Sequence, residues 1–303
     1  MPEGPDGVLL VDKPAGITST RALALCKRAL GSRKGGHTGT LDPFATGLLP
    51  LVFGEATKFS RFLLDSDKTY TATLRLGATS TTGDTEGEIR PGGPVPRGLA
   101  QIGAVSRELL GDSLQVPPMH SAVRVQGQRL YDLARQGLEV ERVPRAIHVE
   151  FIEILEFSGE RPVISVKCSK GAYVRTLGEG LGERVGGGDV LTALRRTETG
   201  GFRVEEAATP DALVGMGIAA ARARLLPVEV LVRTLPRSDL GEREAWAIRN
   251  GQELPSDPAW GDGERALFGP AREFIGVGLV AAGRMAPARL MATGVVAAGP
   301  RGG

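Results

Sequence analysis

The segment that most constrains this chain is residues 35–54, GGHTGTLDPFATGLLPLVFG. Its glycines permit backbone turns that residues with a Cβ cannot follow, so we expect a loop at its start. Asp42 is predicted to lie at a bend, because Pro43 donates no N–H and favours an extended residue before it. The apolar residues 48–53, interrupted by Pro50, then predict a buried strand. The segment therefore carries one carboxylate on an irregular loop beside the core.

The Asp-Pro pair has two interpretations. Taken alone, it is more often a turn cap than a catalytic group. The string GSRKGGHTGT differs from GxxxxGK[ST], so a nucleoside-triphosphate loop is not expected. The longer string GHTGTLDPFATG closely resembles the GHxGTLDPxATG signature of the TruB family of tRNA pseudouridine synthases. In that family this Asp is the catalytic nucleophile, so the resemblance implies the same role for Asp42.

Composition narrows the class of protein. The 303 residues, 41% hydrophobic and 24% charged, suffice for one large domain and a small one. No window approaches 18 uninterrupted apolar residues and MPEGPDGVLL lacks a signal pattern, so we expect a cytoplasmic protein that makes no membrane contact. Two cysteines and three scattered histidines give no disulfide framework and no metal-ligand spacing. No metal is therefore expected.

Charge alone does not decide whether the partner is a nucleic acid. The net charge is only +2, although 30 of the 37 basic residues are Arg. Arginine suits contacts with phosphates and bases, but a GC-rich genome produces the same bias, so the support is mild.

The residues before the signature contribute two candidates. Thr18 or Ser19 is predicted to cap a helix that runs to about Leu30. The opening GVLLVDKPAGITS resembles the family's first motif, so Lys13, which alone would be a solvated turn lysine, is expected to act structurally and electrostatically near the site. His37 alone has no assignable role. The resemblance implies that it inserts near the space left when the target base is flipped out, as a recognition residue that acts sterically and by stacking rather than as an acid or base.

The segment KTYTATLRLG alternates polar and apolar residues and predicts a half-buried strand over 68–77. An aromatic residue on such a strand is usually core. The pattern KTYxATxxLG, however, resembles the family segment whose Tyr stacks on the flipped uracil and has been assigned a proton-transfer role, which implies the same for Tyr70. Asp84 and Glu86 match the family's TxTxDxxG pattern and are expected to order the following loop.

An insertion around residues 115–147 is expected to grip RNA. Its string QVPPMHSAVRVQGQRLYDLARQG resembles QxPPxYSAxKxxGxxxYxxAR of the family. His120 stands where an aromatic residue is usual, and Arg124 replaces the usual Lys. His120 keeps a flat ring and Arg124 keeps a positive charge. We therefore expect the two changes to alter details of RNA contact rather than the activity.

The string SKGAYVRTLGEGLGERVGGG resembles the family's SxGTYIRxLxxDLG, in which the Arg pairs with the catalytic Asp and the Tyr packs against the base. The resemblance therefore implies that Arg175 pairs with Asp42 and that Tyr173 packs on the base. Enclosure around a uracil raises the pKa of a carboxylate, and a bidentate guanidinium would offset this effect. LTALRR completes the resemblance and makes Leu194, otherwise a core residue, an expected apolar wall of the uracil pocket.

Together these patterns predict a mixed α/β (α+β) fold. A pseudouridine-synthase catalytic domain with a central, largely antiparallel sheet is expected over residues 1–234. A small, β-rich, PUA-like RNA-binding domain is expected over residues 235–303, with a mere structural appendage as the alternative. Residues 239–253 within it predict a short helix that ends near Asn250 and Gly251.

The resemblance implies a monomer that isomerises uridine to pseudouridine at position 55 in the T-arm of tRNA, by base flipping and without a cofactor. Three alternatives stay open. A guide-RNA-dependent relative uses the same motifs but usually carries charged extensions, which this chain lacks. A catalytically silent tRNA-binding chaperone of the same fold is opposed by the intact Asp42, Tyr70 and Arg175. An unrelated enzyme with a fortuitous GTLDP turn leaves the other motifs unexplained.

Overall fold

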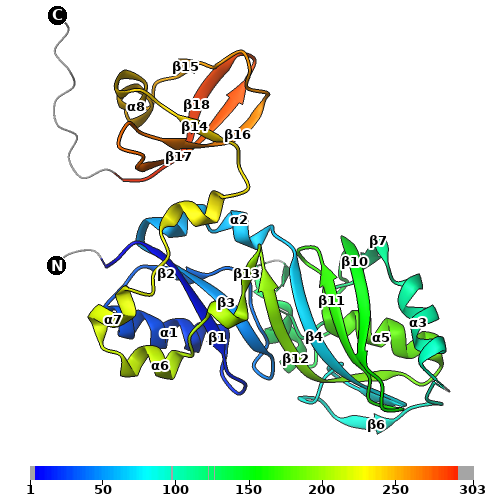
Figure 1. The fold of residues 1–303 in the computed structure, drawn as a ribbon. Coiled ribbons are helices and arrows are strands. Elements are labelled where there is room, and N and C mark those ends of the chain that lie inside the picture. The colour runs from blue at the N-terminus through cyan, green and yellow to red at the C-terminus, as the bar shows by residue number, and fades with distance from the viewer. Residues whose placement is uncertain (1–3, 97, 122, 126, 293–303) are drawn as a thin grey trace, which may run out of the picture.

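The computed structural model describes residues 4–96, 98–121, 123–125 and 127–292. Residues 122 and 126 of the expected insertion and 293–303 of the expected second domain therefore lie outside the described residues. The chain forms a large body built around one broad sheet and a smaller β-rich body near the C-terminus (Figure 1).

Nine strands form the large sheet, and its order is β1-β3-β12-β4-β11-β10-β7, with β2 added on β3 and β13 on β12. Within the described residues every neighbouring pair is antiparallel except β3 with β12. The expected central, largely antiparallel sheet is thus confirmed. The strands are β1 Gly7–Lys13, β2 Gly35–His37, β3 Thr46–Phe53, β4 Lys68–Leu76, β7 Gly111–Gln115, β10 Arg145–Glu156, β11 Val163–Cys168, β12 Asp189–Thr199 and β13 Phe202–Arg203.

Helices cover this sheet: α6 lies beside β1 and packs with α1 and α7, α3 lies beside β10, and α5 packs against β12 and β4 (Figure 1). The helices are α1 Ser19–Leu30, α2 Arg61–Leu64, α3 Leu99–Glu108, α4 Leu130–Arg135, α5 Val174–Val185, α6 Pro210–Gly215 and α7 Ile218–Arg222. Short 3-10 turns are η1 Gly54–Phe59, η2 Val204–Glu206 and η3 Val228–Val232, and two small hairpins are β5 Ala78–Ser80 with β6 Ile89–Pro91 and β8 Arg124–Val125 with β9 Gln128–Arg129.

Helix α1 spans Ser19–Leu30, which confirms the predicted bounds. The Thr18 side chain accepts a hydrogen bond from the N–H of Arg21 at 3.1 Å, which satisfies a donor of the first turn. Gly31 ends the helix in the left-handed region with φ 61°, where a residue with a Cβ would be strained. Its buried face includes Ala22 and Cys26, so Cys26 is a core residue, as its helical spacing predicted.

Strand β1 separates two hydrophobic cores. Leu9 and Val11 point into a core shared with α1, β4 and α5. Val8 and Leu10 point the other way, into a core that also contains residues of the C-terminal body. Because successive side chains of a strand point to opposite faces, this one buried strand links both bodies to a single framework.

Two details of residues 35–54 differ from expectation. Gly35–His37 form strand β2 rather than a loop, since a Cβ on Gly35 would lie 2.8 Å from the Phe53 ring and glycine permits this close pairing. Pro50 does not interrupt the following strand. Its carbonyl accepts from the N–H of Thr38, just past β2, so its missing N–H points away from β1 and the ladder between β1 and β3 loses no bond.

The C-terminal body is a five-stranded sheet with the order β14-β16-β17-β18-β15, accompanied by helix α8 Glu242–Arg249. Its strands are β14 Arg237–Asp239, β15 Leu254–Pro255, β16 Gly263–Phe268, β17 Phe274–Ala281 and β18 Arg284–Leu290. The predicted short helix and β-rich character are confirmed. Phe274 meets Phe59 of the large body edge-on at 5.3 Å between ring centroids, so apolar packing joins the two bodies.

Among the described residues, no helix combines the length and the apolarity that crossing a bilayer requires.

Candidate active site

A cavity of about 360 Å³ opens where the Asp42 loop, β4, β12 and the start of α5 meet. Most of the predicted site residues converge on it, although they come from segments far apart in the chain. The lining includes Gly39, Leu41, Asp42, Lys68, Tyr70, Arg145, Tyr173, Arg175, Leu194 and Arg196.

Neighbouring groups hold the loop that carries Asp42 on both sides of the acid. Before it, Ser19 Oγ accepts from the N–H of Leu41 at 2.8 Å and donates to its carbonyl at 3.0 Å. After it, Lys13 Nζ donates to the carbonyl of Pro43 at 3.2 Å. Lys13 and the capped start of α1 therefore fix the bend, which gives Asp42 a defined direction.

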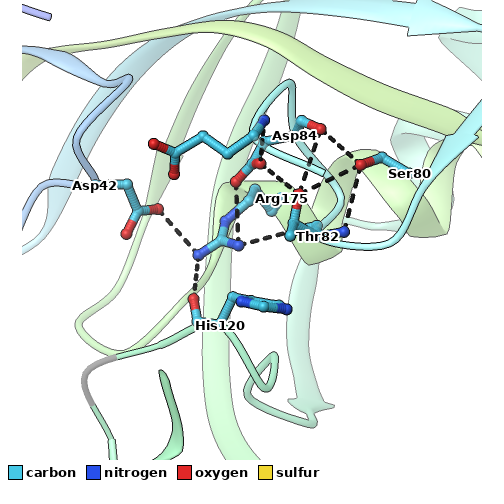
Figure 2. Close-up of polar contacts among 7 residues, drawn as sticks. Asp42, Ser80, Thr82, Asp84, His120 and Arg175 are labelled. Atoms are coloured by element: carbon cyan, nitrogen blue, oxygen red, sulfur yellow. Dashed lines mark hydrogen bonds and ion pairs between the residues drawn. The ribbon is translucent and has the colours of Figure 1, made fainter. Parts of the chain in front are cut away.

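Arg175 lies at the centre of a buried charge cluster (Figure 2). Its Nη2 lies 3.0 Å from Asp42 Oδ2 and its Nη1 lies 3.2 Å from Asp84 Oδ2. The pairing with Asp42 is therefore present, but the expected bidentate contact is not, because the guanidinium is shared between two carboxylates. We call Asp42, Asp84 and Arg175 the active-site cluster.

Backbone carbonyls complete the coordination of this arginine. Nη1 donates to the carbonyl of Thr82 at 2.9 Å, and Nη2 donates to that of His120 at 2.6 Å. Asp84 Oδ1 in turn accepts from Thr82 Oγ1 and from the N–H of Glu86, so Asp84 orders its loop as predicted and also holds Arg175. The side chain of Arg175 is only 4% exposed, so its contacts are well shielded from solvent.

The two carboxylates of the cluster differ in exposure. The Asp42 side chain is 32% exposed towards the cavity, whereas that of Asp84 is 2% exposed. Burial is the largest influence on Asp42 and raises its pKa, Arg175 opposes this effect, and Asp84 adds to it. Asp42 is therefore the more accessible acid and is less readily ionised than a free aspartate.

Tyr70, Leu194 and Tyr173 form walls of the cavity. The first two lie on the neighbouring strands β4 and β12 and are both 8% exposed. Tyr173 precedes α5, and Gln115 clamps its backbone by accepting from its N–H at 2.7 Å and donating to its carbonyl at 3.2 Å. Burial raises the pKa of both phenols. The walls therefore present two neutral aromatic rings and one aliphatic side chain.

Lys13 and His37 lie beside the cavity without lining it. Lys13 is fully buried, and burial lowers its pKa to about 8 against the opposing charge of Asp42. His37 lies on β2, where burial and then the charge of Arg196 lower its pKa. Five of the predicted residues therefore line the cavity, whereas Lys13 and His37 do not. The five are Asp42, Tyr70, Tyr173, Arg175 and Leu194.

His120 and Arg124 are the two positions, noted above, where this chain departs from the family pattern. His120 contributes its backbone carbonyl to Arg175, which any residue at that position provides, and its ring packs edge-on against Tyr131. Arg124 is exposed and donates to the carbonyl of Gly127 at 2.7 Å. Neither substitution removes a contact within the active-site cluster.

Three contributors were not assigned to the site from sequence: Asp84 as a partner of Arg175, Gln115 and Arg196. Arg196 lies two positions after Leu194, and that spacing would have indicated a shared face if residues 189–199 had been predicted as a strand. Within the described part of the chain, no three side chains of His, Cys, Asp or Glu gather as a possible metal site.

Comparisons with known proteins identify relatives along most of the chain. The N-terminal domain of TruB family pseudouridylate synthases matches residues 27–174, and the C-terminal domain of pseudouridine synthase II TruB matches residues 236–291. A tRNA pseudouridine synthase B from Thiobacillus denitrificans is 48% identical over 95% of this chain and 96% of its own. One from Neisseria gonorrhoeae is 47% identical over 83% and 84%, respectively.

Solved structures show the same fold. The chain resembles one in a Cbf5-Nop10-Gar1 complex with a TM-score of 0.70 and 28% identity, covering 90% of this chain and 78% of that one. A chain in an H/ACA RNP bound to a substrate RNA containing 2′-deoxyuridine gives a TM-score of 0.68 and 27% identity, with 90% and 77% covered.

Proposed function

This chain belongs to the TruB family of pseudouridylate synthases, and we propose that it converts uridine to pseudouridine at position 55 in the T-arm of tRNA. The observation that carries the proposal is that Asp42, the one carboxylate among the described residues that line the cavity, projects between aromatic and aliphatic walls and is held by a buried arginine. This arrangement fits a flat, uncharged base presented to one nucleophile.

The target base has to leave its stack before it can enter the cavity. Flipping costs roughly a few kcal/mol, which contacts with the extruded base repay. We assign Tyr70 and Tyr173 to stacking and packing on the uracil, and Leu194 to the apolar wall. His37, beside the cavity, is assigned to the space that the base vacates.

The reaction itself is an isomerisation. The bond between uracil N1 and ribose C1′ breaks, a bond between C5 and C1′ forms, C5 loses a proton and N1 gains one. Atoms and electrons balance without an oxidant or reductant. Asp42 acts as the nucleophile in its ionised form, Arg175 favours that form and fixes its direction, and Tyr70 is assigned to proton transfer.

We divide the chain into a catalytic domain over residues 1–234, with an RNA-gripping insertion around 115–147, and a PUA-like RNA-binding domain over 235–303. Guanidinium groups of Arg237 and Arg265 lie over the rings of Phe268 and Trp260 in the second domain. Phe268 is buried, but Trp260 and Arg265 are partly exposed, and a cationic, aromatic surface of this kind suits nucleic acid. We also propose that the protein acts on tRNA as a cytoplasmic monomer.

The test is release of tritium from uracil C5 of a labelled, unmodified tRNA transcript, followed by mapping of the modified base. We expect the wild type to release label at one T-arm uridine. Asp42→Asn, nearly equal in shape, should bind the transcript with similar affinity and release none, a loss of at least about 10³-fold.

Other results point to the alternatives. Binding of tRNA by the wild type without release favours the chaperone or guide-dependent interpretation, and guide RNA added to the assay separates these two. Release by Asp42→Asn at the wild-type rate removes Asp42 from the nucleophile's role.

A further inference from the structure

Arg196 is the largest side chain among the fully buried residues, with 1% of its surface exposed, and it lines the cavity. Its Nε donates to the carbonyl of Leu48 at 2.7 Å and its Nη2 to that of Gly39 at 3.2 Å. Leu48 belongs to β3, and Gly39 belongs to the loop that carries Asp42. Two backbone tethers therefore fix the plane of the guanidinium.

Tyr70 lies opposite Arg196 in the antiparallel pairing of β4 with β12. Directly opposed residues share a face of the sheet, and both side chains line the cavity. Burial raises the pKa of the Tyr70 phenol, and the charge of Arg196 is the next influence and lowers it. Because a guanidinium has only donors, any hydrogen bond between the two groups uses the phenol oxygen as acceptor and leaves the phenol proton to point elsewhere.

The charge of Arg196 has no neutralising carboxylate. Arg175 pairs with two acids, whereas Arg196 makes no ion pair within the described residues and is satisfied by carbonyls. Burial and then the charge of Arg196 lower the pKa of Lys68 to about 8. The floor of the cavity therefore carries a fixed positive charge next to the group assigned to proton transfer.

We propose that Arg196 is a positioning residue that acts through Tyr70. Its tethers to Leu48 and Gly39 hold the guanidinium against the phenol oxygen, which turns the phenol proton away from Arg196 and towards the cavity. Lysine does not substitute, because a single ammonium on a flexible stem lacks the rigid fork that meets two carbonyls and a phenol in one plane. The kinetic part of the proposal rests on the function proposed above, and the spectroscopic part does not.

The first experiment observes Tyr70 directly. The chain has three tyrosines, so ¹³Cζ-labelled tyrosine gives three signals, and Tyr70→Phe identifies one of them. We expect the Tyr70 signal to shift in both Arg196→Met and Arg196→Lys. The control is Arg195→Met, which alters the preceding residue of β12. The Arg195 guanidinium pairs with Asp12 at 2.8 and 2.9 Å, and its side chain is 42% exposed. Arg195→Met should leave the Tyr70 signal unchanged.

The second experiment is a double-mutant cycle on tritium release at saturating tRNA. We expect Arg196→Met to lower kcat about 100-fold with KM changed less than about threefold, and to cost less than about fivefold in a Tyr70→Phe background. A residue that only fills the core would give equal losses in both backgrounds. Thermal unfolding checks that each variant is folded, and Arg196→Lys, which keeps the charge, serves if Arg196→Met is not.

The outcomes separate the two proposals. An unshifted Tyr70 signal in a folded Arg196 variant, or additive losses in the cycle, overturns the role of Arg196. A wild type that releases no tritium overturns the proposed activity on tRNA alone, while the Tyr70 signal still decides whether Arg196 orients the phenol.

Discussion

Two charged clusters in this molecule have opposite composition. In the active-site cluster, one cation, Arg175, is shared by the acids Asp42 and Asp84. At the junction of the two bodies, one acid, Glu55, accepts from Lys34 Nζ, Lys58 Nζ and the N–H of Ala292. We call Glu55 and these three partners the junction cluster.

The composition of each cluster determines the pKa of its acid. Asp42 has too few partners to offset its burial, so its pKa is raised. Burial also opposes ionisation of Glu55, but hydrogen bonds from Lys58, Ala292 and Lys34 outweigh it and lower the pKa to about 2. The same ion-pair chemistry thus leaves one carboxylate reactive and makes the other an inert clamp between the bodies.

The largest effect is expected where the shared cation is removed. Arg175→Met removes the cation that pairs with the 2%-exposed Asp84 and with Asp42, so we expect the free energy of unfolding to fall by about 3–5 kcal/mol and tritium release to fall by about 10³-fold. Denaturant unfolding and the release assay measure the two losses.

A second substitution separates these effects. Adding Asp84→Asn to Arg175→Met removes a buried, unpaired charge, so stability should recover by at least about 1 kcal/mol while activity stays low. Recovery of both would mean that Arg175 serves folding alone.

A moderate effect is expected when the junction cluster loses its acid. Glu55→Gln should lower the free energy of unfolding by about 2 kcal/mol at pH 7, because three donors lose a charged acceptor. The pKa of Glu55 is lowered from 4.5 to about 2, so its contribution is fully present above about pH 4.5 and is lost as pH falls towards 2. Urea unfolding of both proteins from pH 7 to pH 3 should show the difference shrinking, and tritium release should change little.

A smaller effect is expected on the pH dependence of activity when Asp84 loses its charge. Asp42 has to be ionised to react, so activity is lost as pH falls through its pKa. Because Asp84 raises that pKa, Asp84→Asn should move the acid limb of the single-turnover profile to lower pH. A limb that moves to higher pH would show that Asp84 acts mainly by holding Arg175 in place.

The smallest effect is expected at an exposed ion pair between the bodies, Arg61 with Glu264. The Arg61 side chain is 54% exposed, so Arg61→Ala should change the free energy of unfolding by no more than about 0.5 kcal/mol. If Arg61→Ala lowers the free energy of unfolding as much as Glu55→Gln does, the three donors of Glu55 do not make the junction cluster stronger than a single exposed ion pair.

Local signals made some elements predictable. Thr18 and Gly31 mark the ends of α1, and strict alternation over Lys68–Leu76 indicates β4. The site residues were named from motif resemblance rather than spacing, because Asp42 and Arg175 meet only through tertiary structure. The division of Arg175 between two acids depends on where the Asp84 loop lies, which no local pattern encodes.

Arg196 was missed for a specific physical reason. Strand β12 shifts register between Leu191 and Ala193 and again between Arg196 and Glu198. Each irregularity breaks the alternation of buried and exposed side chains, so the residues around LTALRR do not show a period of two. The sequence wrongly predicted that Pro50 interrupts its strand. Only the pairing partners of β3 show that the strand tolerates the missing N–H.

The tether from Arg196 to the carbonyl of Gly39 spans 157 residues of sequence. Contacts of such separation form late, because the intervening chain has to be ordered first. During synthesis, the loop of Asp42 leaves the ribosome long before β12 does, and its anchor does not yet exist. A nascent chain therefore carries Asp42 on a loop that lacks this anchor until β12 has been synthesised and has inserted between β3 and β4.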